Sequence, residues 1–272
     1  EKQGRTLLAQ QTCTLEDLQE GGREMAAQQW QLSHEKHTNG AVEILVNHEY
    51  RFVYLVVRKA ASSTIRSILD STFGTQGVAR TPSCSSRQTC ERDFEDRSTL
   101  HLDEEILADY FKFTFVRDPV ARFYSGMMEA NRSGEVKLHP QMCKEQVSEI
   151  VKEMRHGGMW APNVHLSSQS FALSSPVRVG GRTGMVILDW VEDVRNLAAS
   201  FSSLLDRIEV SAGKKLPQNM RDEALRLAHK RVNVSRRQRE DTCWSDDIAR
   251  LVRETLAQDV VCFGGDAAAR SG

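Results

Sequence analysis

A six-residue apolar run, Phe52–Val57, most constrains the fold of this chain. It is far too short to cross a bilayer and has the composition of a buried strand. A short turn follows it, and then Ser62–Phe73 with helical periodicity. A second unit of this kind joins the β-rich run Phe111–Val116 to a predicted helix at Val120–Ala130. Recurring strand–loop–helix units predict an α/β fold, with a mainly parallel sheet flanked by helices.

The rest of the chain fits the same class. Ala41–Val46 and Arg51–Val57 predict a hairpin, 75–99 an inserted loop, and Leu102–Tyr110 a short acidic helix capped by Asp103. Further elements are expected as one strand and four helices, at Met185–Asp189 and at Lys144–Arg155, Val191–Leu205, Asp222–His229 and Ser245–Gln258.

The 272 residues suit one large α/β domain or two small ones. We expect an N-terminal helical stem or extension at 1–40, one domain at 41–264 and a flexible tail at 265–272. The net charge of −1 gives no overall field that selects nucleic acid, so any anion site must be local. Because the chain opens at Glu1 without an initiator Met, a removed membrane anchor before residue 1 stays an open expectation.

The six cysteines include no CxxC pair, which argues against zinc, and we expect no metal. They allow up to three disulfides or none, among them a local Cys84–Cys90 bridge in an oxidising compartment. The sequons at Asn131 and Asn233 are compatible with a secreted glycoprotein.

The turn after the first apolar run predicts an anion site. A helix N-terminus offers backbone amides and a partial positive charge, small residues let an anion approach, and Lys59 adds a full charge. The Walker glycines are absent, and Lys59 precedes the small residues instead of following them, which disfavours an ATPase or GTPase. An ordinary strand–turn–helix with a serine cap remains the alternative. The candidate residues are Arg58, Lys59, Ala60, Ala61, Ser62, Ser63 and Thr64.

A second candidate site follows Phe111–Val116. Arg117 stands at the end of this strand, where ligands of open α/β sheets bind, and its guanidinium can hold a phosphate bidentately. Asp118 and Pro119 are suited to begin the next helix, which carries Ser125 as a second donor. The alternative is a salt-bridged Arg117 and a space-filling Ser125.

Together these segments resemble the 5′-phosphosulfate loop and the 3′-phosphate motif of sulfotransferases that use 3′-phosphoadenosine 5′-phosphosulfate (PAPS), above all the Golgi carbohydrate sulfotransferases of the chondroitin and dermatan type. The resemblance covers about Ala41–Gly264 and is most specific at Tyr110–Ser125. It implies a single P-loop-like sulfotransferase domain in the Golgi lumen. It also implies PAPS as donor, with PAP as product, and a carbohydrate acceptor.

The chain departs from the family pattern at several positions. Arg58 replaces a proline, Ser63 a threonine, and Leu166 the tryptophan after His165, and a cysteine pair after that histidine is missing. These departures are compatible with cofactor binding but weaken any inference about the acceptor. A small-molecule or non-glycan acceptor therefore remains an alternative, as do a P-loop nucleotide phosphotransferase and a non-catalytic binding protein.

Transfer to a hydroxyl needs a base, and histidine suits that role because its ordinary pKa is near neutrality. The resemblance points to His165, and other branches of the family point to His101. Glu104 and Glu129 are alternatives, and each histidine could instead be structural. The loop 75–99 and the basic run His229–Arg239 are candidate acceptor contacts, although a solvated basic face explains the run equally well.

Overall fold

The structure is a computed structural model, and it describes residues 43–73, 78–80, 101–102, 109–156, 165–166, 168–174, 176–179, 182–185, 188–230 and 243–263. The chain forms two compact units. The sheet unit lies within 39–116 and 175–234, and the described part of the helical unit lies within 117–174 and 235–263. The predicted stem at 1–40, the tail at 265–272, Cys84, Cys90 and the Asn233 sequon lie outside the described residues.

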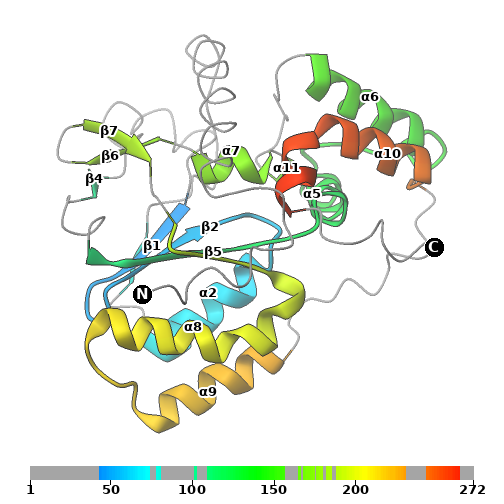
Figure 1. The fold of residues 1–272 in the computed structure, drawn as a ribbon. Coiled ribbons are helices and arrows are strands. Elements are labelled where there is room, and N and C mark those ends of the chain that lie inside the picture. Colours follow the sequence, from blue (N-terminus) through cyan, green and yellow to red (C-terminus); the bar gives the residue numbers. More distant parts are fainter. Residues whose placement is uncertain are drawn as a thin grey trace. The chain divides into compact units, whose positions relative to one another are not determined.

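The sheet unit is built on a five-stranded sheet in the order β3-β1-β2-β5-β8 (Figure 1). β1 is antiparallel to both β2 and β3, whereas β2, β5 and β8 are parallel to one another. Four of the five strands therefore point the same way, which confirms the predicted mainly parallel sheet. The strands are β1 (Glu43–Asn47), β2 (Phe52–Val56), β3 (Val78–Arg80), β5 (Phe111–Val116) and β8 (Trp190–Asp193).

The predicted hairpin is present as β1 and β2, in the register Glu43↔Val56. Its turn is closed by the Tyr50 amide, which donates to the Asn47 side chain over 2.7 Å. Val78–Arg80, expected within an inserted loop, instead pairs with β1 as an edge strand. That part of the loop prediction was wrong, because a three-residue strand carries too little periodicity to be recognised.

Helices α2 (Ser62–Phe73), α8 (Leu197–Ala212) and α9 (Gln218–His229) cover one face of this sheet (Figure 1). The bounds of α2 agree with the prediction. The core between the layers includes Phe52, Tyr54, Phe113, Ile65, Leu69, Phe201, Leu204 and Ile208. Each such side chain contributes about 1.5–3 kcal/mol when it leaves water.

Two predictions at the other edge of the sheet were wrong. Of the strand expected at Met185–Asp189, Met185 ends the separate strand Arg182–Met185, and 186–187 lie outside the described residues. Leu188 and Asp189 precede β8, which begins at Trp190. The Asp189 carboxylate accepts from the Lys112 amide, and the Asp189 amide donates to the Lys112 carbonyl. The helix expected from Val191 begins at Leu197, because β8 and the 3₁₀ turn η2 (Val194–Asn196) come first. Asp193 caps that turn by accepting from the Arg195 amide.

A second sheet of three short strands, in the order β4-β6-β7, belongs to the same unit. Its strands are β4 (His101–Leu102), β6 (Pro176–Val179) and β7 (Arg182–Met185). Leu102 therefore begins no helix, and pairing with β6 explains the difference from the prediction. Residues 103–108 of that predicted helix, including Asp103 and Glu104, lie outside the described residues.

The helical unit consists of α5 (Pro119–Ser133), α6 (Cys143–His156), α7 (Gln169–Ser174), α10 (Asp246–Thr255) and α11 (Ala257–Phe263). The helix predicted at Ser245–Gln258 is thus two helices that meet at Leu256. Apolar side chains of α5, α6 and α10 share a core that includes Phe123, Met127, Val147, Val151, Ile248 and Val252.

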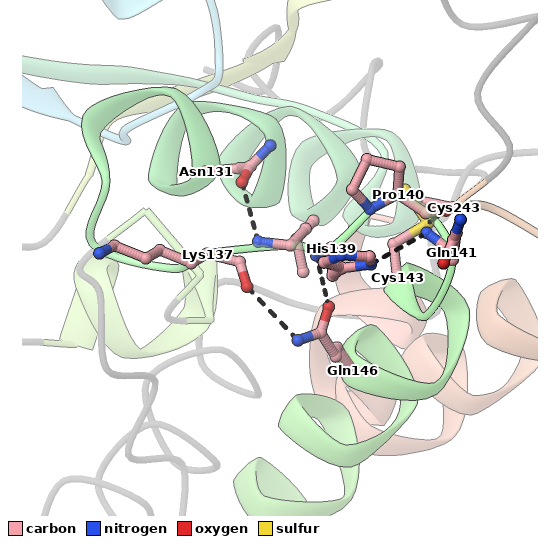
Figure 2. The surroundings of a disulfide bond; sticks show 9 residues. Asn131, Lys137, His139, Pro140, Gln141, Cys143, Gln146 and Cys243 are labelled. Atoms are coloured by element: carbon pink, nitrogen blue, oxygen red, sulfur yellow. Dashed lines mark hydrogen bonds between the residues drawn. A yellow bond between two sulfur atoms is a disulfide. The ribbon is translucent and has the colours of Figure 1, made fainter.

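A disulfide between Cys143 and Cys243 joins the start of α6 to the segment before α10 (Figure 2). It closes a sequence separation of 100 residues, which restricts the unfolded chain strongly. Cys262 is also disulfide-bonded. Within the described ranges, no helix is both long enough and apolar enough to traverse a membrane.

Candidate functional site

The strands that lead into the two predicted anion motifs are neighbours. β2 and β5 are parallel, with Phe52 opposite Phe111 and Tyr54 opposite Phe113, so their carboxyl ends lie at the same edge of the sheet. The Thr114 hydroxyl, fully buried in β5, also donates to the Leu55 carbonyl over 2.8 Å. Ligands of open α/β sheets bind at this edge.

The loop after β2 has an unusual backbone. Lys59 and Ala61 have positive φ angles of 66° and 54°, whereas Ala60 between them does not. Non-glycine residues in this region cost about 1–3 kcal/mol each and are concentrated at functional sites. The Ala60 amide donates to the Val57 carbonyl, and helix α2 begins with the bond from the Ile65 amide to the Ala61 carbonyl. A turn of this kind, next to a helix N-terminus, can direct several amides at one anion.

The predicted side chains of this loop divide by exposure. Ala60 is fully buried, and Ser62 and Thr64 are buried at 7% and 4% exposure. Arg58, Lys59 and Ala61 are half-buried, and Ser63 is exposed. Of the three predicted hydroxyl donors, Ser63 is therefore the one best able to reach a ligand in solution. Ser62 and Thr64 are among the buried residues of α2.

The turn after β5 matches its prediction closely. The Asp118 carboxylate accepts from the Ala121 amide over 2.8 Å, and Pro119 is the first residue of α5. This cap fixes where the helix begins, and a cap of this type is worth about 1 kcal/mol. Arg117 and Ser125 are both half-buried, so both remain within reach of a ligand.

Helix α5 also holds the backbone of His165. Arg122 Nη1 donates to the His165 carbonyl over 3.0 Å. A Cβ atom at Gly126, one turn further on, would lie 2.3 Å from the same oxygen, so only glycine allows this approach. His165 is half-buried, and Leu166 after it is fully buried in the core of the helical unit. Leu166 thus provides an apolar anchor directly after His165.

Arg122 is the most strongly perturbed cation of this region. The pKa of its guanidinium is lowered to about 10, because burial and, to a smaller extent, the charge of Arg117 outweigh the raising effect of the Asp259 carboxylate. Arg122 therefore stays protonated at neutral pH. Sequence reasoning missed the structural roles of Arg122, Gly126, Asp259 and Gln169, whose partners are distant in sequence.

The other predicted bases are placed differently. His101 lies in β4 of the sheet unit, where it pairs with Arg178, and its side chain is not among those described. Glu129 lies in α5 and forms an ion pair with Arg132. In the part of the chain that the structure describes, no three His, Cys, Asp or Glu side chains are grouped to hold a metal.

Comparison with known proteins gives the class of protein. The model of the sulfotransferase family matches residues 42–264, and the chain belongs to that family. The match includes every residue of the two units that the structure describes.

Among curated proteins, the chain is similar to carbohydrate sulfotransferase 14 of Danio rerio, with 31% identity over 139 residues, which is 50% of this chain and 36% of that protein. It is also similar to carbohydrate sulfotransferase 14 of Mus musculus, with 33% identity over 122 residues, 44% of this chain and 30% of the relative. The chain thus matches about a third of the length of these relatives. No solved structure gives a significant match.

Proposed function

We propose that this chain transfers the sulfuryl group of PAPS to a hydroxyl of a carbohydrate acceptor. The observation that carries the proposal is the parallel pairing of β2 with β5, because the carboxyl ends of these strands lead directly to Lys59 and Arg117. The family match supports sulfuryl transfer, and the names of the two relatives support a carbohydrate as acceptor.

The donor set of the two motifs suits a nucleotide with phosphate at both ends. Lys59, Ser63 and the amides at the start of α2 would hold the 5′-phosphosulfate, while Arg117 and Ser125 would hold the 3′-phosphate. Bound PAPS supplies an activated sulfuryl group and no metal is needed for this step. Lys59 would neutralise the charge that develops on the bridging oxygen as the S–O bond breaks.

The acceptor hydroxyl requires a general base, and His165 is our first candidate. Its backbone is fixed by Arg122 and Gly126, and its half-buried side chain keeps access to solvent. His101 is the second candidate. The neutral imidazole of either residue could accept the proton of the acceptor hydroxyl.

The secretory pathway, with the Golgi lumen as its working compartment, is the location we propose. The Cys143–Cys243 disulfide supports an oxidising compartment. The division into a stem at 1–40, a catalytic domain at 41–264 and a tail at 265–272 belongs to the same proposal.

A thermal-shift and calorimetric titration with PAP tests cofactor binding. The wild type should bind PAP, and Lys59→Ala and Arg117→Ala should each weaken binding about 10- to 100-fold, because each removes charge-assisted hydrogen bonds. Lys144→Ala and Arg253→Ala are matched controls, because both change exposed cations of the helical unit and should leave PAP affinity unchanged.

Transfer of labelled sulfate to a panel of glycans then tests activity. Product formation that is lost in His165→Ala but retained in His101→Ala would assign the base to His165. Stabilisation by ATP but not by PAP would contradict the proposal and favour a phosphotransferase, as would turnover that depends on magnesium.

A further inference from the structure

A buried glutamine holds the backbone of Arg117 from both sides. The Arg117 amide donates to Gln169 Oε1 over 2.9 Å, and Gln169 Nε2 donates to the Arg117 carbonyl over 2.7 Å. Gln169 is fully buried at the start of α7, 52 residues further along the chain. Its carboxamide thus satisfies both backbone groups of the residue at which β5 ends.

Asp259 of α11 fixes the position of this glutamine. Its fully buried carboxylate accepts from the Gln169 amide, from the Ser168 hydroxyl, and from both the amide and the hydroxyl of Ser170, all at 2.7–2.8 Å. Charge-assisted hydrogen bonds of this length are about twice as strong as neutral ones. The buried Asp259 carboxylate therefore anchors the segment that carries Gln169. The pair of bonds from the Gln169 carboxamide to the Arg117 backbone is called the glutamine clamp below.

Simple packing does not require this arrangement. An ordered, buried glutamine loses up to about 2 kcal/mol of side-chain entropy and must also give up its bonds to water. The clamp fixes the peptide groups on both sides of the Arg117 Cα, so it sets the direction in which the guanidinium leaves the backbone. A displacement of about 1 Å at such a group is enough to weaken recognition strongly.

We propose that Gln169, anchored by Asp259, is a positioning residue that aims Arg117 at the 3′-phosphate of the bound nucleotide. This inference rests on the proposed function. Gln169 acts only through Arg117, so it should govern affinity for the 3′-phosphate and not affinity for the remainder of the nucleotide.

A second glutamine of the same unit provides a matched control. Gln146 of α6 also bonds to a loop backbone through both ends of its carboxamide, with Oε1 accepting from the His139 amide over 2.7 Å and Nε2 donating to the Lys137 carbonyl over 3.4 Å (Figure 2). Its loop contains no predicted site residue. Removal of this clamp should affect stability without changing nucleotide selectivity.

The test compares PAP with adenosine 5′-monophosphate, which lacks the 3′-phosphate, by competition calorimetry on the full chain. In the wild type, PAP should bind more tightly than the monophosphate. Gln169→Met, which keeps the side-chain length but removes both hydrogen bonds, should weaken PAP binding about tenfold and leave monophosphate binding within about twofold. Gln146→Met should change neither affinity.

Ser170→Ala provides a milder variant if Gln169→Met does not fold, because it removes only one of the bonds to Asp259. It should weaken PAP binding about two- to threefold, again without an effect on the monophosphate. Equal weakening of both ligands, or unchanged PAP affinity in the folded variant, would overturn the positioning role. If the wild type itself binds PAP no better than the monophosphate, the assignment of the 3′-phosphate to Arg117 fails, and the proposed function fails with it.

Discussion

The two anion motifs of this chain are held in opposite ways. The Lys59 loop has two non-glycine residues with positive φ, at Lys59 and Ala61, and passes directly into α2. The Arg117 turn has ordinary backbone angles, a capping carboxylate at Asp118 and a buried glutamine clamp. Because its backbone is strained, the stability of the Lys59 loop should change when a residue with positive φ is replaced by glycine. The stability of the Arg117 turn should depend instead on polar partners that are distant in sequence.

The largest expected effect is a loss of stability when the buried anchor of the Arg117 turn is removed. Asp259→Ala removes the acceptor of four buried donor groups, so we expect a loss of about 3–5 kcal/mol in the free energy of unfolding. Denaturant titration measures it. Asp259→Asn keeps one acceptor oxygen, so its free energy of unfolding should fall by less than that of Asp259→Ala. If Asp259→Ala unfolds like the wild type, the turn does not depend on its buried anion.

The next effect concerns the segment that α5 holds. Gly126→Ala places a methyl group 2.3 Å from the His165 carbonyl, so we expect a loss of about 2–3 kcal/mol and a fall in kcat with little change in the KM for PAPS. Steady-state kinetics and thermal unfolding measure both. Gly134→Ala is the matched control, because its φ of +78° costs about 1 kcal/mol but its Cβ meets no atom within 4 Å. An equal fall in kcat in both variants would exclude a specific role for Gly126.

A smaller effect is expected at the helix cap. Asp118→Ala removes the acceptor of the Ala121 amide at the start of α5, and should lower the free energy of unfolding by about 1 kcal/mol. PAP affinity should fall as well, because Arg117 directly precedes the cap. Asp118→Asn should recover most of the stability, since asparagine caps nearly as well; a loss equal to that of alanine would contradict this account.

The smallest expected effect is an increase in stability. Ala61→Gly relieves a positive φ of 54°, so it should raise the free energy of unfolding by up to about 1 kcal/mol while it loosens the loop and weakens PAP binding a few-fold. Ala60→Gly is the control, because buried Ala60 has no positive φ and its replacement should destabilise. Destabilisation by Ala61→Gly would mean that the loop is not strained.

What the sequence predicted follows from how local each signal is. Ser62–Phe73 and Phe111–Val116 were recognised because periodicity and apolar runs are local properties, and the Asp118 cap because its partner is three residues away. The family resemblance added the predicted roles of Lys59 and Arg117. All of this depends on short stretches of chain.

The rest could not be predicted, because it arises from contacts between distant segments. The clamp joins residues 52 positions apart and its anchor joins residues about 90 apart, so neither leaves a local pattern. The strand at Trp190–Asp193 was misplaced because the apolar run before it looks equally β-like, and only pairing with β5 selects the register. The strain at Ala61 is invisible because the residue type itself gives no hint of a positive φ.

A crystal structure with PAP tests most directly whether the two motifs bind one nucleotide. We predict the 5′-phosphate in the turn at Lys59, within hydrogen-bond distance of the amides at the start of α2, and the 3′-phosphate on the guanidinium of Arg117. A PAP molecule bound with either phosphate on other residues, or two molecules that occupy the two motifs separately, would contradict the account.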